Sequence, residues 1–376
     1  MDSSPPAVTP QHPTPEQSIP DVSVIIPARN EESAIRDCLQ SLTSQTGVTF
    51  EIIVVDDSST DRTREIAKSF SGVRVISPES LPEAKTGKKF TGKNNAVIAG
   101  ASQARANWLL FTDADTVHVP RSLGRALAEA ETNFAHLLSY SPQQVVVTFA
   151  ERAVMPVIFA ELAEQYPPHK VRDQNSGIVA ANGQYILVRR SAYESVGGHA
   201  AVATEILEDV ALARLFRDAG YSIYFRYAAD AVRARMYRNW QQLCEGWTKN
   251  LALLFPQPGR LALQSLSRWL VAWSAIAITF SATLNHHSVW ILSAALWLLV
   301  YQRIRTAHFT TGNNLLAIAF GLPVFAYLLL RSKKAYAKGK VSWKGRTYNT
   351  DGNTAAGIKA TKPVGEIGNQ PLRTES

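Results

Sequence analysis

Short apolar runs alternate along the first half of the chain with segments in which apolar residues recur every three or four positions. The short runs predict buried strands, and the recurring pattern predicts helices. The predicted strands are 22–27, 50–55, 73–76, 108–113 and 145–150, and the predicted helices are 31–44, 60–70, 94–106 and 121–131. This alternation favours an α/β domain with a mostly parallel sheet, which we expect from Asp21 to about Tyr227.

Two acidic clusters stand where predicted strands end. Asp56 and Asp57 follow one apolar run, and Asp113 and Asp115 follow another. Ligands of parallel sheets collect beyond the carboxyl ends of the strands, so both clusters are expected to face one crevice. Because four converging carboxylates repel one another, a cation or cationic side chains should lie among them. The D-x-D spacing can give a hard metal two oxygen ligands, which suggests a metal-bound anion such as a nucleotide diphosphate.

Three longer apolar segments follow Trp247, at Leu266–Phe280, Val289–Tyr301 and Leu315–Leu330. Their combined apolar surface predicts association with a membrane, and a buried helical subdomain is the alternative. Each is somewhat short for a full crossing, which takes about 20 apolar residues. Three crossings would place the basic segment 331–340 opposite the catalytic domain, against the positive-inside rule. Either one segment is re-entrant, or a further segment near 251–263 also enters the bilayer.

Composition divides the chain of 376 residues into four predicted regions. Residues 1–20 are rich in proline and are predicted to be a disordered leader, followed by a catalytic domain over 21–250. Membrane-associated helices are predicted over 251–332, and a basic, largely disordered tail over 333–376. The net charge is +8, but from residue 331 onward ten Lys and Arg face three Asp and Glu. The charge therefore suggests an anionic membrane surface as partner and not nucleic acid.

Some classes of protein are not supported by the motifs present. No GxGxxG and no GxxxxGK[ST] follows the first predicted strand, so neither a Rossmann dinucleotide site nor a P-loop is expected. The two cysteines are too few for a disulfide framework or a thiolate metal site. Cys38 falls on the apolar face of a predicted helix with Ile35, Leu39 and Leu42, where it should pack in the core.

Six motifs occur in an order that resembles the family-two glycosyltransferases of the GT-A fold. They are VIIPARNEE, VVDDSSTD, GKNNA, FTDADT, NGQ and EILEDVALARLF, and the resemblance covers about residues 21–250. Each motif is weak by itself, whereas six in order are a strong indication. The resemblance implies a GT-A domain, a nucleotide-diphospho-sugar donor and a divalent metal, followed here by a C-terminal helical membrane region.

The resemblance assigns the nucleoside of the donor to residues after the first two predicted strands. Pro27, Arg29, Glu31 and Asp57 match the family's nucleoside-binding set, and a carboxylate can accept hydrogen bonds from uracil or ribose. Asp57 could instead only take part in a turn before a helix. Lys93 matches a basic residue near the nucleotide, although a lysine in such a loop could equally be a solvated surface residue.

The D-x-D residues match the family's metal-binding element. Asp113 is assigned to the donor and the metal, and Asp115 is the principal metal ligand. Mg²⁺ or Mn²⁺ held there would neutralise the leaving diphosphate, where negative charge develops as the bond to the sugar breaks. An acidic loop without a metal is the alternative, and it would be electrostatically costly.

The later motifs match the family's base and its acceptor side. The family places its general base at Asp209, in the pair Glu208 and Asp209, where one carboxylate deprotonates the attacking hydroxyl in an inverting transfer. Both acids could instead simply favour a helix amino terminus. Gly183 and Gln184 resemble an element that lines the sugar or acceptor pocket, to which Glu208 is also assigned.

The segment after the base departs from the family's pattern. Many relatives carry Gln-x-x-Arg-Trp there, whereas aligning that Trp on Trp247 leaves Leu243 and Gly246 in place of Gln and Arg. Trp247 could still stack on an acceptor. The stretches EGWTKN and VSWKGRTY resemble the branch of ceramide glucosyltransferases and of hopanoid- and carotenoid-associated glycosyltransferases, which implies a lipid acceptor.

The expected activity is therefore inverting transfer of one sugar, with UDP-glucose as the expected donor, to a membrane lipid. The expected location is the cell membrane, with multi-pass or partly re-entrant attachment and the catalytic domain facing the cytoplasm. A processive polysaccharide synthase is the enzymatic alternative, disfavoured by the missing Gln and Arg and the few apolar segments. A non-catalytic membrane scaffold is the other, disfavoured because Asp57, Asp113, Asp115 and Asp209 are all present.

Overall fold

The computed structural model describes residues 19–78, 92–282, 289–343 and 346–349. The chain forms two compact units. The first contains residues up to Pro142 together with Asn182–Ala203 and Ala228–Arg233, and the second contains Gln143–Ala181, Thr204–Tyr227 and the chain from Ala234 onward. The predicted disordered leader, except for residues 19 and 20, and most of the predicted disordered tail lie outside the described residues.

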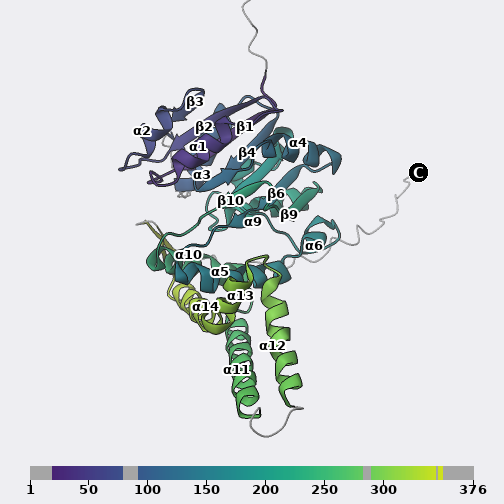
Figure 1. The fold of residues 1–376 in the computed structure, drawn as a ribbon. Helices are drawn as coiled ribbons and strands as arrows, with labels where there is room; N and C mark the ends of the chain where they lie inside the picture. Colours follow the sequence, from purple (N-terminus) through teal and green to yellow (C-terminus); the bar gives the residue numbers. More distant parts are fainter. Residues whose placement is uncertain (1–18, 79–91, 283–288, 344–345, 350–376) are drawn as a thin grey trace, which may run out of the picture. The chain divides into compact units, whose positions relative to one another are not determined.

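The first unit is built on a mainly parallel sheet (Figure 1). Within it the strands follow the order β3-β2-β1-β4-β8-β6, in which β8 is antiparallel to both of its neighbours. Their bounds are β1 (Val22–Ala28), β2 (Phe50–Asp56), β3 (Val73–Ile76), β4 (Trp108–Thr112), β6 (Leu137–Ser141) and β8 (Tyr185–Arg189). The α/β fold class and the first four predicted strands are thus confirmed.

The register of the parallel strands aligns their carboxyl ends. Ala28 at the end of β1 pairs with Asp56 of β2, and Ile25 pairs with Phe111 near the end of β4. The residues that follow β1, β2 and β4 therefore leave the sheet at one edge, as the positions of the two acidic clusters predicted.

Helices flank this sheet at the predicted places. They are α1 (Ile35–Thr43), α2 (Thr63–Lys68), α3 (Gly92–Gln103) and α4 (Ser122–Thr132). The sequence analysis did not predict α7 (Arg190–Ser195), α8 (Gly198–Ala201) or β5 (Thr116–His118), which follows β4. Gly100 lets α3 approach the sheet closely, because a Cβ there would stand 2.5 Å from a methyl carbon of Ile25. Cys38 is buried on α1 with Ile35, Leu39 and Leu42, so its predicted role in the core is confirmed.

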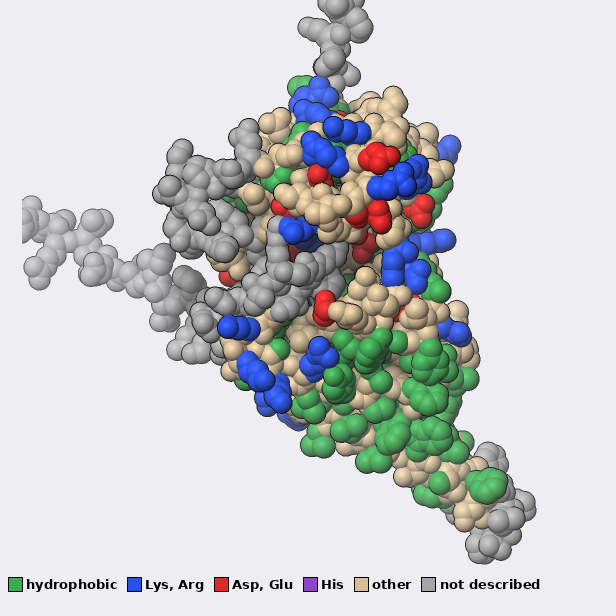
Figure 2. All heavy atoms as spheres, turned by 90° about the vertical axis from the view of Figure 1, so that its left-hand side faces the viewer, with side chains coloured by type: hydrophobic (Ala, Val, Ile, Leu, Met, Phe, Trp, Pro, Cys, Tyr) green, Lys and Arg blue, Asp and Glu red, His purple; other side chains and the backbone are tan. Residues whose placement is uncertain are grey.

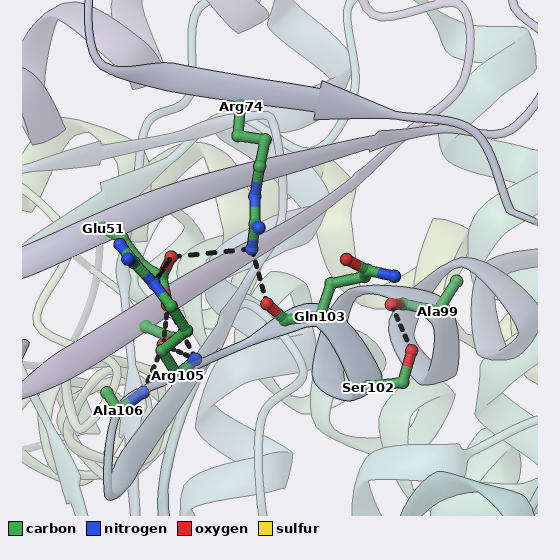
Figure 3. Close-up of polar contacts among 8 residues, drawn as sticks. Glu51, Arg74, Ala99, Ser102, Gln103, Arg105 and Ala106 are labelled. Atoms are coloured by element: carbon green, nitrogen blue, oxygen red, sulfur yellow. Dashed lines mark hydrogen bonds and ion pairs between the residues drawn. The ribbon is translucent and has the colours of Figure 1, made fainter. Parts of the chain in front are cut away.

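A carboxylate network closes the opposite edge of the sheet, where the strands begin (Figure 3). Glu51 Oε1 accepts hydrogen bonds from the Ser23 hydroxyl at 2.6 Å and from the Arg105 backbone N–H at 2.7 Å. Glu51 Oε2 lies 3.1 Å from Arg105 Nε and 3.5 Å from an Arg74 nitrogen. Burial alone would raise the pKa of Glu51, but the hydrogen bonds from Ser23 and Arg105 outweigh it and lower the pKa.

The second unit is largely helical (Figure 1). Its helices are α5 (Phe149–Gln165), α6 (Pro168–Arg172), α9 (Glu208–Asp218), α10 (Trp240–Leu254), α11 (Pro258–Ala282), α12 (Val289–Arg305), α13 (Thr311–Leu316) and α14 (Leu322–Ala337), with a π-helical turn at Ala317–Gly321. Its strands are β7 (Gln143–Gln144), β9 (Ile223–Tyr227), β11 (Lys340–Trp343) and β12 (Arg346–Asn349), and β10 (Val232–Ala234) bridges the boundary in sequence. The three apolar segments are therefore helical, and the described part of the predicted tail forms the end of α14 and a β-hairpin.

The strand predicted over 145–150 is wrong. Only Gln143 and Gln144 form a strand, and α5 begins at Phe149. Thr148 accepts a hydrogen bond from the Glu151 backbone N–H, and the Glu151 carboxylate accepts one from the Thr148 N–H at 2.6 Å. This capping box satisfies the first backbone donors of a helix and outweighs the strand propensity of three successive valines.

Helices α5, α10 and α14 share one core with parts of α11 and α12. Leu251 in the last turn of α10 is buried in this core, and entry of a segment near 251–263 into the bilayer stays a prediction. Beyond this core, α11 and α12 run side by side with their apolar side chains exposed (Figures 1 and 2). The exposed residues are Leu270, Val271, Trp273, Ile276, Ile278 and Phe280 on α11 and Ile291, Leu292, Leu296, Leu298 and Leu299 on α12.

Candidate active site

The loops that follow β1 and β2 are fastened to each other at the carboxyl edge of the sheet. Asn30 Oδ1 accepts a hydrogen bond from the Thr60 N–H at 2.8 Å, and the Glu31 N–H donates to Thr63 Oγ1 at 2.7 Å. Asn30 and Ser58 have φ values of 53° and 58°. This left-handed conformation costs free energy in a residue other than glycine, and it concentrates at functional sites.

Arg29 and Asp57 face each other across these two loops. Arg29 Nη1 lies 3.6 Å from Asp57 Oδ2, and the Asp57 side chain is 14% exposed. Burial raises the pKa of Asp57, the Arg29 charge opposes this shift, and the neighbouring Asp56 adds to it. Asp56 itself is paired with Arg64 at 3.1 Å and accepts the Ser59 N–H, so it stabilises the loop.

The D-x-D residues lie after β4 at the same edge. Lys93 Nζ, in the first turn of α3, lies 3.0 Å from Asp113 Oδ1. Lys93 therefore belongs to a helix and not to a loop. It forms an ion pair with Asp113, whereas the predicted alternative was a solvated surface lysine. Asp113 and Asp115 are both partly buried. The strand pair Thr112 and Tyr185 places Gly183 and Gln184 beside the start of the D-x-D turn.

A buried polar cluster beneath this turn was missed by the sequence analysis. The Thr112 hydroxyl donates to the Gln184 carbonyl oxygen at 2.8 Å, and the Thr116 hydroxyl donates to the Asp113 carbonyl oxygen at 2.7 Å. His118 Nε2 lies 3.3 and 3.2 Å from these two hydroxyl oxygens. Because each threonine hydrogen is already used, we assign the ring hydrogen to Nε2.

This cluster holds its charge state over a wide pH range. Burial lowers the pKa of His118 to about 3, so the ring is neutral at physiological pH. Burial also raises the pKa of Cys38 to about 12, and the nearby charges of Asp115, Asp113 and Glu31 favour the same direction. Neutral donors thus fix the backbone on both sides of the D-x-D turn. Polar residues spaced through an otherwise buried segment were the sequence signal for this cluster.

The D-x-D carboxylates fit a divalent metal that shares its coordination with a substrate. Within the residues that the structure describes, no group of three or more His, Cys, Asp or Glu side chains is arranged to hold a metal ion. Two carboxylates are nevertheless what Mg²⁺ commonly takes from a protein when phosphate oxygens supply further ligands. Asp113 and Asp115 would hold the ion, and Lys93 already compensates part of their charge.

The remaining predicted site residues belong to the second unit. Glu208 and Asp209 form the first turn of α9, and Asp209 Oδ1 accepts the Val210 N–H at 2.8 Å. Tyr166 lies near Asp209 and Arg214. Burial raises the pKa of Tyr166 to about 12, the Arg214 charge opposes this shift, and the Asp209 charge adds to it. The helix start predicted for Glu208 and Asp209 is confirmed, whereas their catalytic roles stay predictions.

Trp247 is a core residue of α10. Its side chain is 2% exposed, its indole N–H points to the Met155 sulfur at 3.4 Å, and its ring packs edge-on against Phe159 and Tyr237. Gly246 leaves room for the same Tyr237 ring, which explains why a large residue such as Arg does not fit there in this chain. A part for Trp247 in the acceptor pocket stays a prediction.

The first unit thus brings Arg29, Asp57, Lys93, Asp113 and Gln184 to one edge of one sheet. Comparison with known families identifies this unit. Residues 23–197 match the family model described as Glycosyl transferase family 2. Residues 23–197 therefore carry a family-two glycosyltransferase domain, and the protein is a glycosyltransferase that takes its sugar from a nucleotide sugar.

The chain is also similar to a curated enzyme over most of its length. A 4,4'-diaponeurosporenoate glycosyltransferase of Staphylococcus aureus (strain USA300) is 26% identical over 342 residues, which cover 87% of this chain and 88% of that protein.

Two solved structures resemble this one more distantly. A mannosyltransferase from Pyrobaculum calidifontis, solved with GDP-Man and Mn²⁺, is 17% identical with a TM-score of 0.46 and coverages of 85% and 87%. A glucosyl-3-phosphoglycerate synthase from Mycobacterium tuberculosis, solved with Mn²⁺ and UDP-glucose, is 22% identical with a TM-score of 0.41 and coverages of 62% and 76%.

Proposed function

We propose that this protein is an inverting, metal-dependent glycosyltransferase that moves a single sugar, glucose from UDP-glucose, to a membrane lipid. The observation that carries the proposal is the pair of ion pairs at the carboxyl edge, Arg29 with Asp57 and Lys93 with Asp113. One pair suits the hydrogen-bond donors of a nucleoside, and the other suits a diphosphate with its metal.

The proposed donor site divides the work between its residues. Asp57 accepts hydrogen bonds from the base or ribose, and the Arg29 charge opposes the rise in the pKa of Asp57 that burial causes. A bound Mg²⁺ or Mn²⁺ would act as a Lewis acid on the diphosphate. Asp113 and Asp115 orient that end of the donor, and Lys93 contributes positive charge beside it. Neutral His118 keeps the turn that carries both acids in place without adding a charge that varies with pH.

The proposed acceptor is a lipid for two reasons. The similar Staphylococcus aureus enzyme is named for 4,4'-diaponeurosporenoate, whose ending denotes a carboxylate. The exposed apolar side chains of α11 and α12 supply a surface that can associate with a bilayer. Asp209, in the first turn of α9, is the proposed base for a hydroxyl acceptor. An acceptor that arrives as a carboxylate needs no base.

Asp115→Ala tests the donor site. Calorimetry of UDP with Mn²⁺ should show an affinity about 10- to 100-fold lower, since a charged ligand contributes about 1.5–3 kcal/mol. Asp37→Ala, which removes an exposed acid on α1 of the same unit, is the matched control and should bind normally. Unchanged UDP affinity in Asp115→Ala, with activity kept, would show that the metal assignment is wrong.

Asp209→Asn tests the base, with Asp218→Asn at the other end of α9 as the control. Single-turnover transfer to a hydroxyl lipid should fall at least ~10²-fold, while UDP affinity stays the same. Transfer to a carboxylic lipid should fall much less. Lost donor binding would reassign Asp209 to the nucleotide-sugar site, and long polymeric products would favour the processive synthase.

A further inference from the structure

Two helical segments of the second unit are long and apolar enough to cross a membrane. They are Pro258–Ser281, with 24 residues, and Thr311–Ala337, with 27. At 1.5 Å per residue both exceed the roughly 30 Å of a hydrocarbon core. Their packing differs, because 22% of the apolar window is buried in the first and 50% in the second. Length and composition therefore favour two membrane spans, whereas the second segment is much more buried in the protein than the first.

Both ends of Thr311–Ala337 are fastened to polar helices of the same unit. At the start, Arg152 Nε on α5 donates to Asn313 Oδ1 at 2.9 Å. At the end, the Ser332 hydroxyl donates to the Thr248 carbonyl oxygen at 2.7 Å, and the Tyr336 hydroxyl donates to the Lys249 carbonyl oxygen at 2.7 Å. Thr248 and Lys249 lie on α10, so the start of the segment is bonded to α5 and its end is bonded to α10.

The helices that hold these ends carry charges that suit water and not hydrocarbon. On α5, Arg152 and Glu164 are exposed, whereas Glu151 and Glu161 are buried and ion-paired. Helix α10 carries Gln241, Glu245 and Lys249. Charged side chains are costly inside a bilayer, so α5 and α10 belong outside the hydrocarbon. A segment whose two ends are both bonded to them does not have its ends on opposite membrane surfaces.

Helices α11 and α12 are both ion-paired to α5, one near the point where its uncharged stretch begins and the other just after its uncharged stretch ends. Arg268 on α11 lies 2.6 Å from Glu161, and Arg303 on α12 lies 2.9 Å from the same carboxylate and 2.9 Å from Glu164. Past Arg268 to Ser281 on α11, and from Val289 to Tyr301 on α12, the sequence has no charged residue. Apart from Leu263, the exposed large apolar side chains described on both helices lie in these two ranges.

We infer that only the pair α11 and α12 enters the bilayer, and that Thr311–Ala337 lies along the membrane surface without crossing it. The inference rests on the proposed membrane attachment. The polypeptide then makes no crossing or an even number of crossings. The basic end of α14 consequently stays on the side of α5 and α10. Its exposed cations, which can meet anionic headgroups, are Arg331, Lys333, Lys334, Lys338 and Lys340.

This arrangement removes the conflict found in the sequence. Three crossings would have separated the basic segment 331–340 from the catalytic domain, whereas an even number keeps it on the side of the polar helices, as the positive-inside rule expects. The partner of the exposed faces of α11 and α12 is the acyl region of a bilayer, because a cationic and acidic belt at Arg268, Arg303 and Glu161 borders them on one side.

Cysteine accessibility in sealed, uniformly oriented vesicles of the full-length protein tests the topology. Gln241→Cys on α10 and Lys338→Cys after α14 replace exposed residues, and the unsubstituted chain is the control because Cys38 and Cys244 are buried. A membrane-impermeant maleimide should label both variants from the same side and to within about twofold of each other. Labelling of the two from opposite sides would show that Thr311–Ala337 crosses, and would overturn the inference.

Ser281→Cys, near the far end of α11, tests the depth of the hairpin. From the side that labels Gln241→Cys, its labelling should be at least ~10-fold slower until detergent is added, because a residue in hydrocarbon or beyond it is inaccessible. Equal labelling before detergent would contradict bilayer entry. Sugar transfer to lipid in the same vesicles separates the two proposals. Opposite-side labelling with normal transfer refutes only the topology, and same-side labelling without any lipid product refutes only the function.

Discussion

Glu51 and Asp57 stand at the two ends of one strand, and their surroundings shift their pKa values in opposite directions. Glu51, at the start of β2, is 11% exposed and its pKa is lowered by the donors that surround it. Asp57, just past the end of β2, is 14% exposed and its pKa is raised, because burial outweighs the nearby Arg29. Two carboxylates with similar exposure thus have pKa values that are shifted in opposite directions at the two edges of the sheet.

From this difference we expect the amino edge to serve stability and the carboxyl edge to serve binding. A carboxylate whose ionised form is stabilised in the folded protein contributes to folding. A carboxylate that is buried although burial disfavours its charge lowers the stability of the folded protein. Such groups concentrate at functional sites. The amino edge therefore holds the strands together, and we expect the carboxyl edge to serve the binding of a ligand.

Asp57→Asn should have the largest effect of the changes that separate the two edges. UDP affinity should fall at least about tenfold, because a charge-assisted hydrogen bond contributes about 1.5–3 kcal/mol. Thermal unfolding should occur at an equal or higher temperature, since a buried charge is removed. Calorimetry and thermal denaturation on one preparation measure both. A destabilised variant with normal UDP affinity would make Asp57 a structural residue like Glu51.

Glu51→Gln should produce the opposite pair of results. One amide oxygen cannot replace two carboxylate oxygens facing Ser23 and Arg105, so unfolding should become easier by about 1–3 kcal/mol. UDP affinity should not change, because the network lies at the other end of the strands. Urea denaturation measures the stability, with Glu65→Gln, an exposed ion-pair member on α2, as the matched control. If both variants lost a similar amount of stability, the Glu51 network would contribute no more than an exposed ion pair does.

The pH dependence of stability should distinguish the two carboxylates by sign. The pKa of Glu51 in the folded protein lies below its ordinary value of 4.5, so its contribution is present above that pH and is lost as the pH falls further. The pKa of Asp57 is raised, so its penalty is present at neutral pH and disappears as the pH falls. Relative to the unsubstituted chain, Glu51→Gln should look destabilised at pH 7 and nearly equal in acid, while any advantage of Asp57→Asn should shrink. Parallel curves would contradict this.

Arg74→Ala should have the smallest effect. Arg74 is 41% exposed and lies 3.5 Å from Glu51, so removing it should cost less than about 1 kcal/mol and should matter less at high salt. The substitution also removes the hydrogen bond that Arg74 donates to the Gln103 carbonyl oxygen at 2.5 Å. Urea denaturation at low and high salt measures the change in stability. A cost as large as that of Glu51→Gln would place Arg74 at the centre of the network.

Much of the first unit could be predicted because its pattern is local. Strands β1, β2 and β4 are short apolar runs, and the acids that follow them had to meet at one edge once the strands were parallel. The strand predicted over 145–150 failed because three valines were given more weight than the Thr148-x-x-Glu151 capping box, which was also present in the sequence. The local signal was there, but two patterns competed for the same residues.

Pairings within the candidate site could not be predicted from the sequence. Lys93 meets Asp113 because α3 packs tightly on β1 at Gly100, and no spacing along the chain encodes that contact. The neutral state of His118 likewise depends on burial by distant elements. The roles of the site residues, and the domain boundary near residue 250, stay predictions.

The fastening of the two donor-site loops has a consequence for the thermodynamics of recognition. Asn30 and Thr60 bond the loops to each other within the fold itself, so much of the loops' conformational entropy is lost on folding. A nucleotide that binds between ordered loops does not have to immobilise them, and more of its contact energy remains as affinity. The strained backbone at Asn30 and Ser58 is thus maintained by folding free energy, which makes this part of the enzyme rigid before its substrate arrives.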